Sequence, residues 1–246
     1  MALPQIASGE QWLAARRELL AREKELTRAH DLLNADRRRL PMVAVENEYV
    51  FDGPAGRVGL PQLFEGRRQL VVQHFMFDPE WEDGCGSCTA AADELSVGLL
   101  EHLAARCTTF AAVSRAPLVT IDGYRRRRGW TFPWYSSYGS AFNYDFHVTL
   151  DSSVAPVMFN YRDASELREA GLGWVAEQPG EQPGYSCFLR DGNEVFHTYS
   201  TFGRGTEQLG GGYAFLDMTA LGRQEEWEEP KDRVSTARGA VPDFFT

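Results

Sequence analysis

The apolar positions near the N-terminus follow a helical period. Tryptophan and leucine recur there every seven residues: Trp12, Leu19 and Leu26. This spacing predicts a long amphipathic helix over residues 9–33. Ser8 and Gln11 have the spacing of a capping box, which marks the helix start. We expect the apolar stripe to dock on the protein's own core. The alternative is a second copy of the chain, which would make a homodimer.

Continuous apolar runs farther along the chain predict buried strands. Residues 69–77 are nearly all apolar, which is typical of a strand covered on both faces in a parallel sheet. Residues 108–113 form a second run of this kind. Between them, a loop over residues 78–84 is followed by apolar residues at helical spacing as far as residue 103. These patterns predict a strand, a helix and a second strand.

The second half of the chain predicts four more elements and an insertion. The elements are a helix over 117–128, an aromatic strand over 130–138, a hairpin of strands 185–189 and 194–199, and a helix over 214–221. Residues 162–184 contain many Gly and Pro residues and are the best candidate for a variable insertion.

Length and composition limit the class of protein. A chain of 246 residues is one elaborated domain or two small ones, and 43% hydrophobic with 24% charged residues excludes a disordered chain. We divide it into a helical extension (1–40), a main domain (41–224) and a tail (225–246).

Charge and hydropathy bear on the partners. The net charge of −10 argues against nucleic acid as a partner. No apolar run approaches the roughly 18 residues of a membrane span, and the N-terminal residues show no apolar signal sequence. We therefore expect no membrane association and a cytoplasmic location.

The four cysteines include one informative pair. Cys85 and Cys88 are separated by Gly and Ser, a spacing that suits either half of a zinc site or a redox dithiol. Cys107 and Cys187 stand alone and the histidines are scattered, so we expect no metal site. For Cys107 and Cys187 we expect small, buried, apolar roles.

The order of the predicted elements favours the redox dithiol. A buried strand precedes Cys85 and a helix follows it; then come a strand, a helix, a strand, an antiparallel hairpin and a final helix. This is the order of the thioredoxin fold. We therefore predict an α/β, thioredoxin-like domain, in which a central mixed sheet is flanked by helices, with an N-terminal helix and strand extension.

Longer motifs resemble known families. Residues 49–77 (YVFDGPAGRVGLPQLFEGRRQLVVQHFMF) resemble the start of the peroxiredoxin and thiol-reductase branch of this fold. The segments GWTFPWYSSYGSAFNYDF (129–146), SRAP (114–117), FHTYSTFGRG (196–205) and LGRQE (221–225) are similar to the bacterial domain of unknown function 899 family. That resemblance implies a thioredoxin-like fold and dithiol–disulfide oxidoreductase activity.

The expected chemistry depends on where Cys85 lies. A cysteine just before the first turn of a helix faces unpaired N–H groups and the positive end of the helix dipole, and its pKa falls to roughly 3.5–7.5. Cys85 would then attack a protein or small-molecule disulfide as the thiolate, and Cys88 would resolve the mixed disulfide. We expect no cofactor beyond this dithiol, and a thioredoxin-type reductant as partner.

Two other functions compete with this one. The first is a thiol peroxidase, but Glu82 stands where peroxiredoxins carry a threonine, and it cannot polarise a peroxide. Glu82 and Asp83 would also oppose a thiolate if they faced it. The second is a binding module without catalysis, in which the aromatic segments form a ligand pocket. The sequence further departs from thioredoxin in having Gly84, not Trp, directly before the first cysteine.

Six further residues are candidates for the site. His74, on the strand before the dithiol, is a candidate proton carrier, although a hydrogen-bonded core histidine is the commoner role for such a residue. Pro183, with Gly184, is the best candidate for the cis-proline loop that faces the dithiol in thioredoxin folds. Candidate substrate or anion contacts are Arg115, Trp81 and Trp134. For Arg115 an ion pair with an acidic residue is an equal alternative, and for Trp134 a core position is the default.

Overall fold

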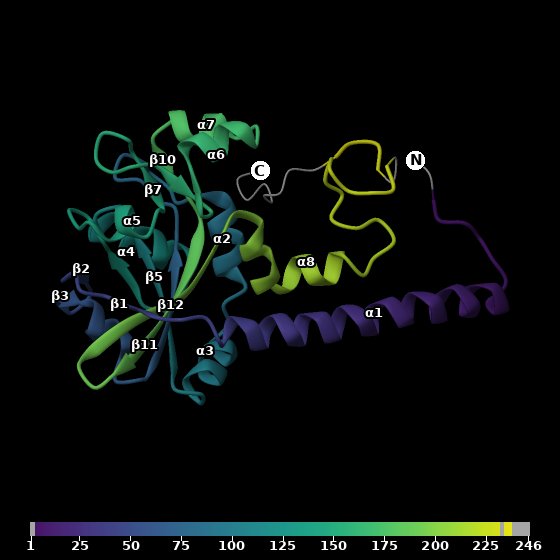
Figure 1. Ribbon diagram of the computed structural model, residues 1–246, viewed down its shortest axis with the longest axis horizontal. Coiled ribbons are helices and arrows are strands. Elements are labelled where there is room, and N and C mark those ends of the chain that lie inside the picture. The colour runs from purple at the N-terminus through teal and green to yellow at the C-terminus, as the bar shows by residue number, and fades with distance from the viewer. Residues whose placement is uncertain (1–2, 232–233, 238–246) are drawn as a thin grey trace.

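The centre of the protein is one eight-stranded mixed sheet, shown in Figure 1. The structure is a computed structural model that describes residues 3–231 and 234–237. The strand order across the sheet is β1 (Val43–Ala44), β12 (Glu194–Phe202), β11 (Gly184–Asp191), β4 (Gln69–His74), β5 (Thr108–Ser114), β6 (Trp134–Ser136), β2 (Val50–Gly53) and β3 (Gly56–Gly59). The strands β4, β5 and β6 are parallel, and β11 and β12 form the predicted antiparallel hairpin.

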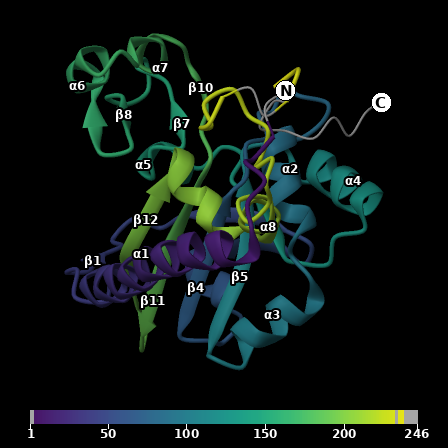
Figure 2. The same ribbon diagram turned by 90° about the vertical axis from the view of Figure 1, so that its right-hand side faces the viewer.

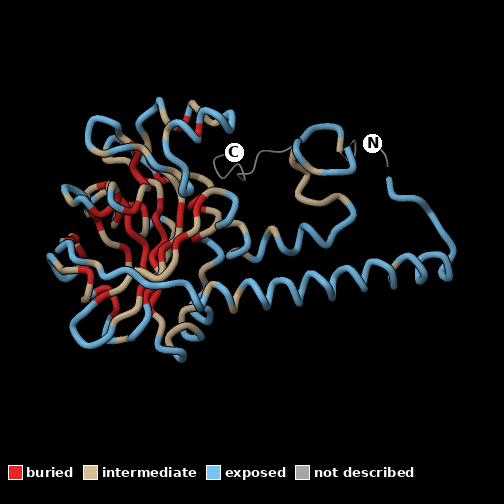
Figure 3. The backbone as a smooth tube through the Cα atoms, viewed as in Figure 1, coloured by how far each residue is buried: buried red, intermediate tan, exposed pale blue. Residues whose placement is uncertain are grey.

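Two apolar layers cover the two faces of this sheet. On one face, α2 (Gly86–Asp93), α3 (Val97–Ala104) and α4 (Leu118–Arg128) pack on a core that includes Phe75 and Trp134. On the other face, η1 (Leu60–Phe64) and α5 (Phe142–Asp145) pack on a core that includes Leu70 and Phe188. Figure 3 shows that the buried residues gather in this body. A central mixed sheet flanked by helices confirms the predicted fold class.

The side chains of β4 alternate between the two layers. Leu70 and Val72 belong to the core beneath η1 and α5, whereas Val71 and Phe75 contact the core beneath α2. Successive side chains of a strand point to opposite faces. Neighbouring positions at the end of this strand therefore serve different layers, which matters for the site.

A small subdomain lies between β6 and β11. It contains β7 (Thr149–Leu150), β8 (Met158–Phe159), β9 (Arg162–Asp163), α6 (Ala164–Glu169), α7 (Gly173–Glu177) and β10 (Gly180–Glu181). Leu150, Leu167 and Val175 form its own buried cluster. The predicted insertion at 162–184 thus forms short helices and strands around a separate core.

The N-terminal helix departs from our prediction. α1 (Gly9–Arg37) starts at the predicted capping box but has no buried residue, and Figures 1 and 3 show it projecting from the body. Trp12 and Leu26 are 62% and 71% exposed. The expected docking of the apolar stripe on the protein's own core is wrong. The alternative, that a second copy of the chain covers this stripe, stays a prediction.

Three element boundaries also differ from the prediction. The expected helix up to residue 103 is two helices, because Ser96 caps a new helix by accepting a hydrogen bond from the Leu99 N–H. The aromatic strand is confined to β6, and the last helix begins earlier, as α8 (Gly211–Leu216), after η2 (Gly203–Leu209). The domain division stays a prediction, and residues 232–233 and 238–246 of the expected tail lie outside the described residues.

Within the described residues, no helix is both long enough and apolar enough to span a membrane.

Candidate redox site and its cavity

Cys85 lies at the N-terminal end of α2, where the loop from β4 enters the helix. It is the N-cap residue, and its backbone N–H donates to the carbonyl of Met76 at 3.0 Å. No side chain caps this helix. The first N–H groups of the helix are therefore available to the partly exposed Cys85 sulfur.

Hydrogen bonds stabilise the Cys85 thiolate. The thiol of Cys88, the hydroxyl of Ser87 at 3.1 Å and the backbone N–H groups of both residues lower the pKa of Cys85 from its ordinary 9.0 to about 5. Partial burial acts in the opposite direction and is outweighed. At neutral pH Cys85 is therefore a thiolate at the positive end of a helix.

Cys88 has the opposite character. It is buried, and the backbone N–H of Met76 lies 3.5 Å from its sulfur. Its hydrogen bond to Cys85 and its burial hold the pKa of Cys88 well above the ordinary value. The two thiols thus differ in charge: Cys85 is negatively charged, while Cys88 stays protonated and donates a hydrogen bond to Cys85.

The acidic residues before Cys85 do not oppose its charge. Asp83 forms an ion pair with Arg127, and Glu82 is exposed. Neither is among the main causes of the pKa shift of Cys85. Gly84 is explained by packing: a Cβ atom at this position would lie 2.6 Å from the ring of Phe75. Phe75 and Tyr124 fill the space beside Gly84, so a tryptophan does not fit there.

A cavity of about 430 Å³ opens beside the dithiol. Its walls come from α2 (Ser87, Cys88), from the ends of β4 and β11 (Gln73, Tyr185), and from η2 and α8. Figure 2 shows α8 near α2. The carboxylate of Glu94, at the end of α2, accepts hydrogen bonds from the N–H groups of Gly211 and Gly212 at 2.6 and 2.8 Å. These bonds hold the C-terminal segment over the cavity.

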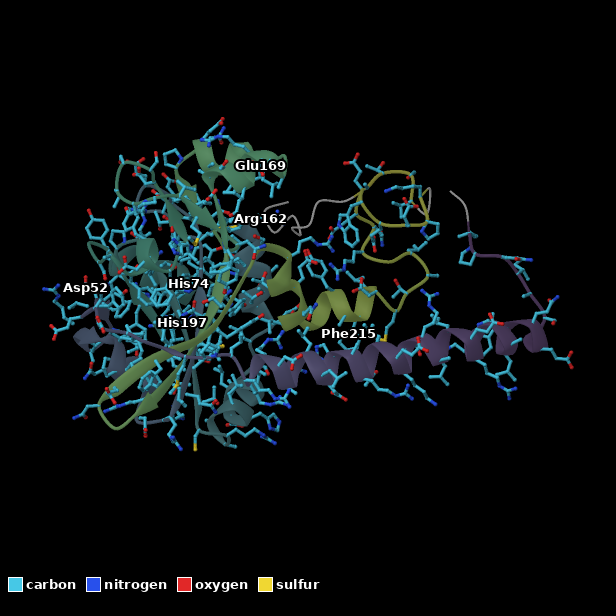
Figure 4. The ribbon with its side chains drawn as sticks, in the orientation of Figure 1. Asp52, His74, Arg162, Glu169, His197 and Phe215 are labelled. Carbon is cyan, nitrogen blue, oxygen red and sulfur yellow. The ribbon has the colours of Figure 1, made fainter. Side chains whose placement is uncertain are left out.

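His74 borders this cavity, but its ring packs in the opposite layer. The ring lies against Phe142 and Phe146, and Nε2 is 2.7 Å from the hydroxyl of Ser186. Burial lowers the pKa of His74 to about 3, with a smaller effect from His197. Figure 4 shows both histidines inside the body. They are connected through Ser186 and Ser200 by hydrogen bonds of 2.7 Å.

This arrangement contradicts a proton carrier at His74. In the part of the chain that the structure describes, no hydrogen bond joins His74 to either sulfur. With so low a pKa the ring stays neutral at neutral pH, so it does not take up and release a second proton as an acid–base carrier would. His74 is a hydrogen-bonded core histidine. The residue that faces the dithiol layer is its neighbour Gln73, which we missed although strand alternation predicts it.

Pro183 and Gly184 also line the cavity, together with Cys88. The Gln182–Pro183 bond is trans, since the cis peptide bond among the described residues precedes Pro230. The expected cis bond is therefore wrong, although the segment does lie near Cys88. Gly184 is required by close packing, because a Cβ there would lie 2.7 Å from the ring of Phe202.

Arg115 is fully engaged by the protein. Its guanidinium donates to Glu181 at 2.6 Å, to Asp78 at 2.7 Å and to the Tyr144 hydroxyl at 2.8 Å. Two carboxylates neutralise its charge, so of the two alternatives the ion pair with acidic residues is confirmed and the anion contact is wrong. Arg115 instead ties the loop after β4 to β10.

The burial of the two candidate tryptophans and of the two isolated cysteines agrees only in part with expectation. Trp134 is completely buried and donates to Ser114 at 3.0 Å, so the default core position is confirmed and the alternative contact with substrate is wrong. Trp81 is 41% exposed on the loop before Cys85, and its contact with substrate stays a prediction. Cys187 is mostly buried as expected, whereas Cys107 is exposed.

All four cysteines are free thiols in the structure. Among the described residues, no group of three or more His, Cys, Asp or Glu side chains could hold a metal ion.

Comparison with protein families identifies the chain. Residues 1–238 match the family described as bacterial protein of unknown function (DUF899). The chain belongs to this family. A search of curated proteins finds no match.

The chain is also similar in structure to solved peroxiredoxins at low sequence identity. Peroxiredoxin Q of Xanthomonas campestris is 14% identical, with a TM-score of 0.46 over 74% of this chain and 98% of that one. Peroxidoxin BcpB of Mycobacterium tuberculosis is 11% identical, with a TM-score of 0.43 over 69% and 93%. A yeast mitochondrial 1-Cys peroxiredoxin is 15% identical, with a TM-score of 0.38 over 69% and 73%.

Proposed function

We propose that this protein is a dithiol–disulfide oxidoreductase that uses Cys85 as nucleophile and Cys88 as resolving thiol. One observation carries the proposal: the sulfur of Cys85 lies at the uncapped N-terminus of α2. Its pKa is about 5, and the protonated thiol of Cys88 donates a hydrogen bond to it. A thiolate is the attacking form in thiol–disulfide exchange.

The reaction balances within the dithiol. The Cys85 thiolate attacks one sulfur of a substrate disulfide, whose S–S bond breaks, and the other half leaves as a thiolate that takes up a proton. Cys88 then loses its proton and attacks the Cys85 sulfur of the mixed disulfide. The second half of the substrate leaves as a thiol, and two electrons have passed from the protein to the substrate. An external dithiol of the thioredoxin class restores the reduced protein.

The thiol peroxidase is less well supported. Peroxide cleavage needs strong donors beside the sulfur. Arg115 is held by Asp78 and Glu181, and Ser87 supplies a single hydroxyl. This shortage of hydrogen-bond donors beside the Cys85 sulfur favours disulfides over hydroperoxides as substrate.

The test is reduction of the insulin disulfides with a thioredoxin-type reductant. We expect Cys85→Ser to abolish turnover. Cys88→Ser should instead accumulate a mixed disulfide at Cys85, detected by mass spectrometry. Cys107→Ser is the matched control, because that exposed thiol lies outside the dithiol, and it should retain full activity. Turnover that persists in Cys85→Ser would refute the proposal, and fast consumption of hydrogen peroxide by the wild type would favour the peroxidase.

A further inference from the structure

A carboxylate without a cationic partner lies in the wall of the cavity beside the dithiol. Glu94, the residue directly after α2, lines this cavity, and its oxygens accept hydrogen bonds from the backbone N–H groups of Gly211 and Gly212. Within residues 3–231 and 234–237, no Arg, Lys or His side chain pairs with Glu94. Backbone N–H groups are neutral donors, so the carboxylate keeps its negative charge and can attract a cation.

The chain fits closely around this carboxylate. A Cβ atom at Gly210 or at Gly212 would lie 2.5 Å from an oxygen of Glu94, closer than any side chain allows. The two hydrogen bonds and this close approach of the glycine backbone fix the position of the carboxylate. The negative charge of Glu94 is therefore a defined feature of the cavity wall.

The other charged side chains beside the cavity compensate one another. Arg204 pairs with Glu207 at 3.1 Å. Arg223 pairs with Glu207 and with Asp217, both at 2.7 Å. Two arginines thus balance two carboxylates, and the charge of Glu94 is left without a counter-ion.

The cavity is electrically negative near the dithiol. Tyr185 lies in its wall, and burial, followed by the ionised forms of Cys88 and Glu94, raises the pKa of this tyrosine. The thiolate of Cys85 adds negative charge beside the wall residue Ser87, whose hydroxyl is 3.1 Å from the sulfur. A bound cation is stabilised in such a place, and a bound anion is repelled.

The length of α2 sets the distance between the nucleophile and this charge. Cys85 is the N-cap and Glu94 the C-cap of the helix, so their backbones lie about 13 Å apart along its axis. Two side chains and an ion pair take up part of this distance, and a disulfide with a short charged arm takes up the rest. The cavity volume of about 430 Å³ also lies in the range of small-molecule pockets, roughly 300–1,000 Å³.

We propose that this cavity is the substrate site for a small disulfide with a positively charged group, an ammonium or a guanidinium, that pairs with the carboxylate of Glu94. The inference rests on the proposed function and names its substrate class. The Cys85 thiolate bonds to one sulfur of the substrate, whose S–S bond breaks, and the other half leaves as a thiolate that takes up a proton from water. Cys88 then attacks the Cys85 sulfur, and the second half leaves as a thiol with the proton of Cys88. The external thioredoxin-class dithiol supplies the two electrons that restore the protein.

The experiment compares three disulfides of similar size and different charge. Cystamine has two ammonium groups, bis(2-hydroxyethyl) disulfide is neutral, and 3,3′-dithiodipropionate has two carboxylates. The rate constant for oxidation of the reduced protein is measured by quenching with N-ethylmaleimide and mass spectrometry. It is divided by the rate constant with dithiothreitol, which corrects for the reactivity of each disulfide and for attraction by a thiolate. We expect wild type to favour cystamine over the neutral disulfide by about fivefold, the value of one partly exposed ion pair. The dithiodipropionate should react more slowly than the neutral disulfide.

Two variants test the origin of this preference. Glu94→Gln should lower it to about onefold, and Glu169→Gln, an exposed glutamate of α6, is the matched control and should keep it. Because Glu94→Gln also changes the contact with the glycines, Ala91→Lys provides a second test. It places a positive charge in the same wall and should shift the preference toward dithiodipropionate. Ala21→Lys on exposed α1 is its matched control and should leave the preference intact.

Competition measures binding separately from the reaction. Hexane-1,6-diamine has the length and charge of cystamine but no disulfide. At constant ionic strength it should slow the oxidation of wild type by cystamine in a saturable manner. Hexane-1,6-diol should have no effect, and Glu94→Gln should no longer respond to the diamine.

The results that would overturn the inference differ from those that would overturn the proposed function. If the three corrected rate constants are equal in wild type but the Cys85–Cys88 disulfide still forms, this substrate site is wrong and the proposed function stands. If neither insulin nor any of the three small disulfides oxidises the dithiol, the proposed function fails and the substrate site fails with it. A preference for cystamine that is unchanged in both Glu94→Gln and Ala91→Lys would also refute the substrate site, because the attracting charge would then lie elsewhere.

Discussion

The helices α1 and α2 show two ways of beginning a helix. α1 starts with a complete capping box, in which Ser8 and Gln11 satisfy each other's backbone N–H groups. It extends for 29 residues without a buried side chain. α2 has eight residues, no side-chain cap and Cys85 at the N-cap position, and three of its residues are buried.

The difference between these helices separates local stability from reactivity. A long, capped helix can form from local interactions alone, because it exceeds the roughly 12–15 residues needed for marginal stability in water. A helix of eight residues depends on tertiary packing instead. Its N–H groups are not used by a cap, and they remain available to stabilise a thiolate.

The largest effect in this comparison should be the ionisation of Cys85. We expect alkylation of the reduced protein by iodoacetamide to show a midpoint near pH 5 for Cys85, against an ordinary 9.0. Because folding lowers this pKa, the thiolate adds stability that is complete above the ordinary value and is lost as the pH falls through about 5. Cys85→Ser provides the background, since exposed Cys107 also reacts. A midpoint near 8 to 9 would remove the difference between the two helix starts.

The second effect concerns the packing that holds the start of α2. Gly84→Ala should lower the free energy of unfolding by about 1–3 kcal/mol, because the new Cβ meets the rigid ring of Phe75. Gly9→Ala at the start of α1 is the matched control, with nothing within 4 Å of the added atom. It should leave the urea midpoint of the body unchanged. Equal losses in the two variants would contradict a packing requirement specific to α2.

A third effect distinguishes the two serines at these helix starts. Ser87→Ala should raise the alkylation midpoint of Cys85 by about 1–2 pH units, because a hydrogen bond to a charged group is lost. Ser8→Ala should cost about 1 kcal/mol of local helix stability and so decrease the helicity measured by circular dichroism. It should leave the alkylation midpoint of Cys85 unchanged. An unchanged midpoint in Ser87→Ala would show that the Cys88 thiol and the backbone N–H groups stabilise the thiolate without Ser87.

The smallest effect should be on the exposed stripe of α1. Leu26→Ala, at a position 71% exposed, should change the free energy of unfolding by less than about 0.5 kcal/mol. Leu63→Ala, at a completely buried position, is the matched control and should cost about 2–5 kcal/mol. If Leu26→Ala lowers the free energy of unfolding as much as Leu63→Ala, or changes the molecular mass measured by light scattering, then a second copy of the chain covers this stripe.

Local patterns in the sequence were sufficient for the positions of most elements. The apolar runs of β4 and β5 and the hairpin of β11 and β12 were predicted from composition and turn residues. The pair Cys85 and Cys88 was found from its spacing, between a strand and a helix. Single residues next to a strand end were harder, because His74 was named as a candidate beside the commoner core role, while Gln73, which faces the dithiol layer, was missed.

Side-chain partners were the main source of error. For Arg115 the sequence left an external anion and an internal acid as equal alternatives, and Asp78 and Glu181 from distant parts of the chain decide for the acid. For Trp134 the sequence left substrate contact open beside a core position, and the residue lies in the core under α2. In both cases the partner is remote in the chain, so no local pattern indicates it.

The sequence by itself determined the order of strands and helices, the cap of α1 and the place of the cysteine pair, because these depend on neighbours a few residues apart. Only the tertiary structure decided that α1 stands without a core, that Gln73 lines the dithiol cavity while its side-chain oxygen is buried without a partner, and that the segment from η2 to α8 forms part of the cavity wall. Burial and partnering depend on residues that come together through folding, and their energies are set by that environment rather than by the residue type.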